Sequence, residues 1–331
     1  MSQDRKRQRV YVNGKRVTFI RRYRGRLIVA CIVLVGAVFS FTWSGFSSGS
    51  DSSAPQISVI PRRVISLAPS VTELIYALGV DSLLVADTRY CKYPSAADTL
   101  PEVGGFLDPN LEMIVSLNPD LVILLKEHDE LQNKLKKLHI PILTVDHQTI
   151  DGILESYTQL GVRLGADAKA DSLAKRQRQH IARIMKLTAG LNHPRTLVSI
   201  GHSDKPGVIR SVYAAGNEGF YSELVRLAGG VNVVKEDNVR YPILGPESIR
   251  ALKPDIILDL FPGAESGSQV DSRFVQNQWR SLSDIPAVRN NRVIVLDGGF
   301  FVIPGPRFIK ILDEFVMALH PEVNISLILN Q

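Results

Sequence analysis

The chain has 331 residues, 22% of them charged, and a formal net charge of +6. A chain of this length can hold two domains, each with its own hydrophobic core. Ten basic residues and one acid, Asp4, lie within residues 1–26, so the 39 basic and 33 acidic residues of the whole chain become 29 and 32 from Leu27 onward. The remainder is therefore mildly acidic, and nucleic-acid binding loses its main electrostatic support.

Residues 27–43 form a run without any charged side chain directly after the basic block. At 1.5 Å per residue this run is about 25 Å of helix, the short end of a membrane span. Positive charge before such a span places the N-terminus in the cytoplasm and exports the rest of the chain. We therefore expect a basic cytoplasmic tail (1–26), a transmembrane or signal segment (27–43) and a flexible linker (44–60). The exported part lies on the periplasmic or extracytoplasmic face, either anchored to the inner membrane through residues 27–43 or released after cleavage.

Cysteine usage excludes a disulfide framework in the exported part, where Cys91 is the only cysteine. The other cysteine, Cys31, ends a box at residues 28–31 that resembles a lipoprotein cleavage site, although the apolar run follows this cysteine instead of preceding it. The exported fold must be held by hydrophobic cores.

Two stretches of the chain, residues 110–124 and 245–258, repeat one pattern at a constant offset of 135 positions, so that Glu112 matches Glu247 and Asp120 matches Asp255. Each copy predicts a short amphipathic helix with an acid in its first turn, a Pro-Asp stop, and an apolar strand. A repeat of this kind indicates two related lobes.

Strands and helices around the repeat also correspond between the lobes. Residues 63–67 and 195–200 predict opening strands, residues 141–145 and 292–296 predict closing strands, and residues 70–79 and 221–230 predict matching helices. Strands that alternate with helices indicate an α/β fold, with a parallel sheet flanked by helices in each lobe.

A long helical connection joins the predicted lobes. Residues 151–164 and about 168–189 read as helices, and the second, at about 33 Å, is long enough to cross between two small lobes. The expected organisation is an N-terminal ligand-binding lobe (61–149), connecting helices (150–190), a C-terminal ligand-binding lobe (191–322) and a tail (323–331). We expect this rigid backbone helix to allow only modest closure between the lobes.

The pattern resembles the helical-backbone substrate-binding proteins of ABC importers, the group that captures iron-siderophores and cobalamin. The resemblance covers residues 62–320, and its most specific parts are residues 63–73, 110–123 and 227–232. It implies a monomer that captures a small-molecule metal chelate, a corrinoid or a ferric siderophore, and delivers it to an ABC permease and its ATPase. No cofactor is expected.

The resemblance also implies that one glutamate in each lobe docks on arginines of the permease, and by position these are Glu112 and Glu247. Both acids belong to the first turn of a predicted helix, where the helix dipole favours negative charge. A carboxylate and an arginine pair bidentately, so two such pairs set a docking orientation. The alternative is that each acid only caps its own helix.

The ligand of a two-lobed α/β protein lies between the lobes, against loops at the carboxyl ends of the strands. Aromatic residues in such loops suit large, flat, partly apolar ligands, and the cobalamin-binding members place tyrosine or tryptophan at the positions of Tyr90, Phe106 and Tyr241. Arg89, Arg210 or Arg240 could meet the charge of a ferric siderophore. The predicted ligand-binding residues are Tyr90, Phe106, His202, Tyr241, Phe300 and Phe301.

Three other readings stay open. His128, His147 and His202 each follow a predicted strand and could mark a receptor for zinc or manganese, although they form no close pair. A haem receptor is a related alternative. A hydrolytic enzyme is the second alternative, but the sequence lacks the usual motifs of such enzymes, so we expect no catalysis and no catalytic residues. The third reading is a membrane-tethered interaction module without a transport role.

Overall fold

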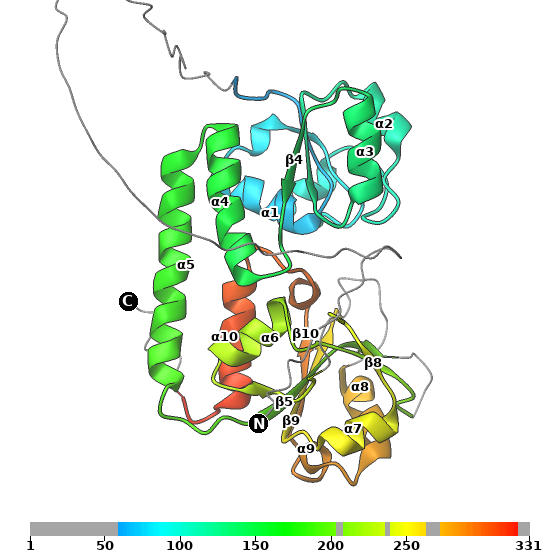
Figure 1. Cartoon of the computed structure of the whole chain (residues 1–331), viewed down its shortest axis with the longest axis vertical. Helices are drawn as coiled ribbons and strands as arrows, with labels where there is room; N and C mark the ends of the chain where they lie inside the picture. Colours follow the sequence, from blue (N-terminus) through cyan, green and yellow to red (C-terminus); the bar gives the residue numbers. More distant parts are fainter. Residues whose placement is uncertain (1–58, 203–207, 236–238, 263–271, 324–331) are drawn as a thin grey trace, which may run out of the picture. The chain divides into compact units, whose positions relative to one another are not determined.

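The computed structural model describes residues 59–202, 208–235, 239–262 and 272–323 (Figure 1). The predicted cytoplasmic tail and membrane segment, nearly all of the linker, and residues 324–331 of the predicted tail lie outside these ranges. Within the described ranges no helix combines the length and apolar character needed to cross a membrane.

Strands alternate with helices through most of the described chain. The strands are β1 (Val64–Ser66), β2 (Leu84–Ala86), β3 (Leu121–Leu125), β4 (Ile142–Val145), β5 (Arg195–His202), β6 (Val212–Ala214), β7 (Val231–Asn232), β8 (Ile243–Leu244), β9 (Ile256–Phe261) and β10 (Val293–Asp297). The helices are α1 (Pro69–Leu78), α2 (Leu111–Ser116), α3 (Asp129–Lys137), α4 (Ile150–Leu164), α5 (Asp167–Thr188), α6 (Phe220–Leu227), α7 (Pro246–Leu252), α8 (Ser272–Gln278), α9 (Pro286–Arg289) and α10 (Phe308–Leu319).

The first sheet has the order β2-β1-β3-β4, and every neighbouring pair is parallel. Its central strands β1 and β3 are buried along their whole length, because helices cover both faces of a parallel sheet and leave no solvated side. The α/β architecture predicted for this part of the chain is confirmed.

The second sheet has the order β10-β9-β5-β6-β8, with β7 paired to β5. Its strands β10, β9, β5 and β7 are parallel, whereas β6 runs antiparallel to both β5 and β8. The prediction of a purely parallel second sheet is therefore wrong. Only residues 203–211 separate β5 from β6, fewer than the dozen or so residues that a parallel crossover needs, so the chain turns back as a hairpin.

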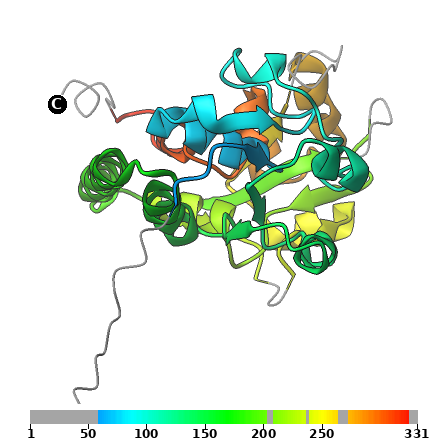
Figure 2. The same ribbon diagram turned by 90° about the horizontal axis from the view of Figure 1, so that it is seen from above.

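Helices α4 and α5 connect the two sheets and lie side by side (Figure 1 and Figure 2). α4 contacts α1 beside the first sheet, and α5 contacts α6 and α10 beside the second. One hydrophobic core runs through these contacts, from Leu74 in α1 through Tyr157 and Ile184 to Phe315 in α10. The connection between the sheets is thus packed along its length.

The first copy of the repeat forms α2 and β3, held to the start of β1 by an arginine and an aspartate. The Arg63 backbone NH donates to Asp120 Oδ1 at 2.9 Å, and the Asp120 NH donates to the Arg63 carbonyl oxygen at 3.0 Å. The Arg63 guanidinium donates to the Leu117 carbonyl oxygen at 2.7 Å, where α2 ends. This network fixes the end of α2 and the start of β3 against the start of β1.

The second copy forms α7 and β9 and repeats that network with its own residues. The Arg195 NH donates to Asp255 Oδ2 at 3.1 Å, the Asp255 NH donates to the Arg195 carbonyl oxygen at 2.8 Å, and the Arg195 guanidinium donates to the Leu252 carbonyl oxygen at 2.7 Å. The sequence repeat is therefore also a repeat of hydrogen bonds, and it places α2 and α7 in equivalent positions on the two sheets.

Candidate functional site

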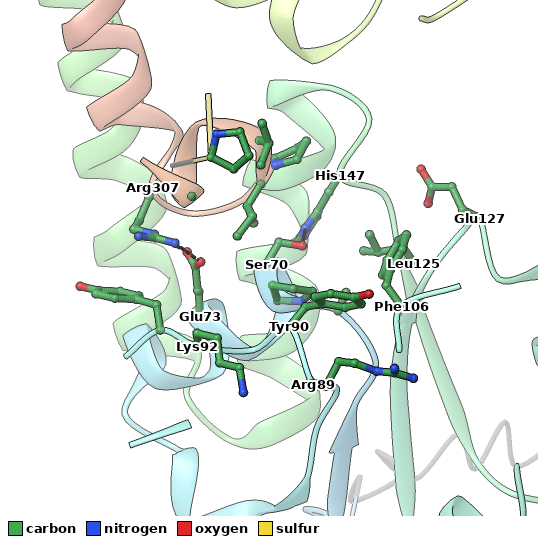
Figure 3. A pocket seen from close by; sticks show the side chains of 18 of the residues that line it. Ser70, Glu73, Arg89, Tyr90, Lys92, Phe106, Leu125, Glu127, His147 and Arg307 are labelled. Carbon is green, nitrogen blue, oxygen red and sulfur yellow. Dashed lines mark hydrogen bonds and ion pairs between the residues drawn. The ribbon is translucent and has the colours of Figure 1, made fainter. Parts of the chain in front are cut away.

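A cavity of about 1020 Å³ lies between residues that follow strands of the first sheet and residues of the second (Figure 3). Residues that follow β1, β2, β3 and β4 form the wall on the side of the first sheet. Residues that precede β8 or follow β9 and β10 form the wall on the side of the second sheet. The carboxyl ends of parallel strands are the usual ligand position in α/β folds. The volume lies at the upper end of the range for small-molecule sites.

Three of the predicted aromatic residues line this cavity together: Tyr90, Phe106 and Tyr241. Tyr90 and Tyr241 are 56% and 39% exposed. Phe106 is held more firmly, because its ring meets the edge of His128 at 4.7 Å between centroids and the His128 ring shares a 2.7 Å hydrogen bond with the Phe106 carbonyl oxygen. Of these three rings, one is therefore fixed and two are exposed, and the exposed ring of Tyr93, which was not predicted as a ligand residue, also lines the cavity.

Phe300 and Phe301, which were also predicted as ligand residues, lie outside the cavity. Phe301 is buried in the hydrophobic core, where its carbonyl oxygen accepts a 2.9 Å hydrogen bond from the Tyr221 hydroxyl. Phe300 stacks on Phe301 at 4.2 Å and does not line the cavity, although Gly299 and Val302 of the same turn do. His202 ends β5, and its side chain lies outside the described structure.

One wall of the cavity contains a buried ion pair that no sequence pattern indicated. Arg307 donates from Nε to Glu73 Oε2 at 2.9 Å and from Nη2 to Glu73 Oε1 at 2.6 Å (Figure 3). The Arg307 guanidinium also lies over the rings of Tyr93 and Phe300, at 4.2 and 5.3 Å from their centroids. Glu73 and Arg307 are 234 positions apart, so no local pattern could have paired them.

A second polar contact across the cavity is more exposed. Arg240, before β8, hydrogen-bonds Gln148 and lies 3.7 Å from Glu127 Oε1, while Gln148 donates to the same Glu127 oxygen at 2.8 Å. All three residues line the cavity. The residues around β3 and β4 thus meet the segment before β8 at this wall.

His147 lines the cavity but uses both ring nitrogens within the protein. Nδ1 lies 2.8 Å from Ser70 Oγ and Nε2 lies 2.9 Å from Ser156 Oγ. Burial lowers the pKa of His147 to about 4, because the charged imidazolium would lose its water. With both nitrogens engaged, His147 is not arranged as a metal ligand, and among the described residues no group of three or more His, Cys, Asp or Glu is placed to hold a metal.

Cys91, the residue after Tyr90, lies in a buried polar cluster. Its Sγ is 3.2 Å from the hydroxyls of Thr72 and Thr88. Burial raises the pKa of the thiol to about 11, and burial likewise raises the pKa of neighbouring Asp87 to about 7. A protonated, buried thiol is a packing residue and not a nucleophile.

The predicted docking acids, Glu112 and Glu247, lie outside the cavity, in the first turns of α2 and α7. Glu112 is exposed, and its helix is capped by Asn110, whose side chain accepts from the Met113 NH at 3.1 Å. The Glu247 side chain is 89% exposed and pairs with Arg250 at 2.9 Å. Capping in α2 is therefore done by another residue, which leaves the Glu112 carboxylate to face solvent.

Known proteins share this fold and much of this sequence pattern. The family model for periplasmic binding proteins matches residues 64–298. This chain belongs to that family. The resemblance inferred from the sequence is confirmed.

The chain is 29% identical over 262 residues to a vitamin B12-binding protein of Pectobacterium carotovorum, covering 78% of this chain and 89% of the relative. It is 28% identical over 268 residues to the ABC transporter substrate-binding lipoprotein YvrC of Bacillus subtilis, covering 79% and 81%. The periplasmic heme-binding protein RhuT from Roseiflexus has a similar structure, with a TM-score of 0.67 at 25% identity over 78% of this chain and 98% of that one.

The chain is therefore a substrate-binding protein of the type used by ABC transporters. Proteins of this group bind ligands and do not transform them, which confirms the prediction that the chain is not an enzyme.

Proposed function

We propose that this periplasmic binding protein captures a corrinoid or a ferric siderophore in the cavity and delivers it to an inner-membrane ABC permease, docking through Glu112 and Glu247. The observation that carries the ligand proposal is the cavity itself, which is large and presents Tyr90, Phe106 and Tyr241 toward one space. Aromatic faces bind large, flat, partly apolar chelates by stacking and by burial of apolar area. A relative that is named for vitamin B12 supports this ligand class.

The docking proposal is supported by the position and the surroundings of the two glutamates. Both are exposed, both lie outside the cavity, and both are carried by helices that equivalent arginine and aspartate residues hold to the sheets. Two exposed carboxylates on helices fixed in this way can each meet an arginine of the permease bidentately, Glu247 by exchanging its exposed partner Arg250, and together they define one docking orientation.

The same proposal assigns the parts of the chain. Residues 61–149 and 191–322 are the two ligand-binding lobes and residues 150–190 are the connection that keeps their closure small. The lobes work on the extracytoplasmic face, where relatives of this kind act, as a monomer, with residues 27–43 as an anchor or a cleaved signal.

The docking proposal is tested by the full-length double variant Glu112→Ala/Glu247→Ala, in cells whose ligand uptake depends on this protein. We expect uptake to be lost, while equilibrium dialysis of the purified variant shows unchanged ligand affinity, because neither glutamate touches the cavity. The control variant Glu130→Ala/Glu322→Ala removes two other exposed acids, whose side chains are 85% and 61% exposed, and should transport normally. Normal uptake by the Glu112/Glu247 variant would refute docking through these residues.

Haem is the second candidate ligand, because a solved structure with this fold is named as a heme-binding protein. Equilibrium dialysis of the purified protein against cyanocobalamin, a ferric siderophore and haem separates the candidates. If none of the three binds, the ligand-capture proposal fails and the reading as an interaction module without a transport role gains support.

A further inference from the structure

Four cationic side chains of the described part of the chain line the cavity, and each is already paired with an acid. On the buried wall Arg307 makes its bidentate contact with Glu73. At the loop after β2, Arg89 Nη2 lies 3.1 Å from Asp108 Oδ2, and Lys92 Nζ lies 3.2 Å from Glu102 Oε1.

The remaining contacts give every one of these four cations an acidic partner. Lys92 also contacts Asp98, and Arg240 lies 3.7 Å from Glu127. The candidates named from the sequence to meet the charge of a siderophore are therefore engaged, apart from Arg210, which is exposed and does not line the cavity. The four cations face five carboxylates in these contacts: Glu73, Asp98, Glu102, Asp108 and Glu127.

Among the described residues, an anionic group that enters such a cavity meets only cations that already lie beside a carboxylate. It can hydrogen-bond to the guanidinium donors that these pairs leave open, but it then lies close to the carboxylate of the same pair, and like charges at close range are unfavourable. A neutral chelate meets no such penalty, because it carries no net charge. It gains binding energy by covering the apolar wall formed by Pro69, Leu125 and Val302 and by stacking on the aromatic rings.

We propose that the cavity selects a metal chelate of low net charge, such as a neutral corrinoid or a neutral ferric trihydroxamate, and discriminates against chelates with several anionic groups. This inference rests on the proposed function, because it names the charge class of the ligand that the cavity carries. The residues that determine this selectivity are the acids paired with the cations of the cavity, among them Asp108 and Glu127.

The test compares two ferric chelates of opposite character on the purified full-length protein: ferrichrome, which is neutral, and ferric enterobactin, which is a trianion. Cyanocobalamin and haem are measured in parallel by equilibrium dialysis. We expect the tightest ligand to be one of the two neutral chelates, with ferrichrome at least roughly tenfold tighter than ferric enterobactin. Tightest binding of ferric enterobactin or haem overturns the charge proposal and leaves the transport proposal standing, whereas binding of none of the four overturns both.

A second arm asks whether the internal pairs set the selectivity. The variant Asp108→Asn releases Arg89 and should tighten binding of ferric enterobactin roughly two- to fivefold without changing binding of ferrichrome. The matched control is Glu130→Gln, which removes the same charge from an exposed pair with Lys134 on α3, outside the cavity. An unchanged ratio of the two affinities in Asp108→Asn would overturn the assignment of selectivity to these pairs.

Discussion

Two polar contacts connect the walls of the cavity, and they differ chiefly in burial. Glu73 and Arg307 have side chains that are 2% and 15% exposed, whereas Glu127 and Arg240 are 34% and 39% exposed. The first pair is bidentate and its guanidinium lies over the Tyr93 ring, and the second is a 3.7 Å contact open to solvent. Breaking the first pair should therefore destabilise the protein much more than breaking the second, because a buried charge without its partner cannot recover its water.

The largest expected effect is on the buried wall. The variant Arg307→Met leaves the Glu73 carboxylate buried without this partner, and we expect the free energy of unfolding to fall by roughly 3 to 5 kcal/mol. The double variant Glu73→Gln/Arg307→Met removes both charges and should recover much of that loss. Both values are measured by urea unfolding at neutral pH. A loss in Arg307→Met of less than about 1 kcal/mol, which is the range for exposed pairs, would remove the distinction between the two contacts.

A smaller effect on the same wall should depend on pH, through His147. Its pKa in the folded protein is lowered to about 4, from an ordinary value of 6.5, because it is buried against Ser70 and Ser156. The unfolded chain binds this proton between pH 6.5 and 4 while the folded protein does not, so its contribution to stability is complete above pH 6.5 and is lost as the pH falls toward 4.

The variant His147→Gln isolates this contribution. Between pH 7 and 4 the wild type should lose up to roughly 3 kcal/mol more than the variant does. Comparison with the variant also cancels the opposite contribution of Asp87, whose pKa is raised to about 7 and which loses stabilisation as the pH rises. Parallel stability curves for the two proteins over this range would show that His147 is not held neutral by the fold.

The smallest effect is expected on the exposed wall. The variant Arg240→Ala should change the free energy of unfolding by less than about 1 kcal/mol, because Arg240, Glu127 and Gln148 can return to water when their contact is lost. The matched variant is Arg250→Ala, which breaks another exposed pair, with Glu247 and Asp284. Destabilisation of Arg240→Ala similar to that of Arg307→Met would mean that the two walls are equivalent after all.

Much of the fold was predictable because it depends on local pattern. The apolar runs that became β1, β3, β5 and β9 and the helices that follow them are signalled by residues close together in the chain. The reversal of β6 was missed because the second half was expected to repeat the first, and a short hairpin breaks that symmetry.

The cavity was only partly predictable. Tyr90, Phe106 and Tyr241 were named because they lie in loops after or before strands, and the structure brings them to one space. Phe301 was named by the same reasoning, but the turn after β10 directs its side chain into the core. Which way a side chain points from a loop depends on the neighbours against which it packs, and a single sequence does not state these.

The sequence by itself determined the repeated halves, their strands and helices, and the equivalent positions of Glu112 and Glu247, since periodicity and a constant offset are properties of the chain alone. Only the tertiary structure decided that Glu73 meets Arg307, that the four cations described around the cavity each have an acidic partner, and that His147 is kept neutral. Burial and charge pairing depend on which distant segments meet, and folding brings together residues as far apart as 234 positions.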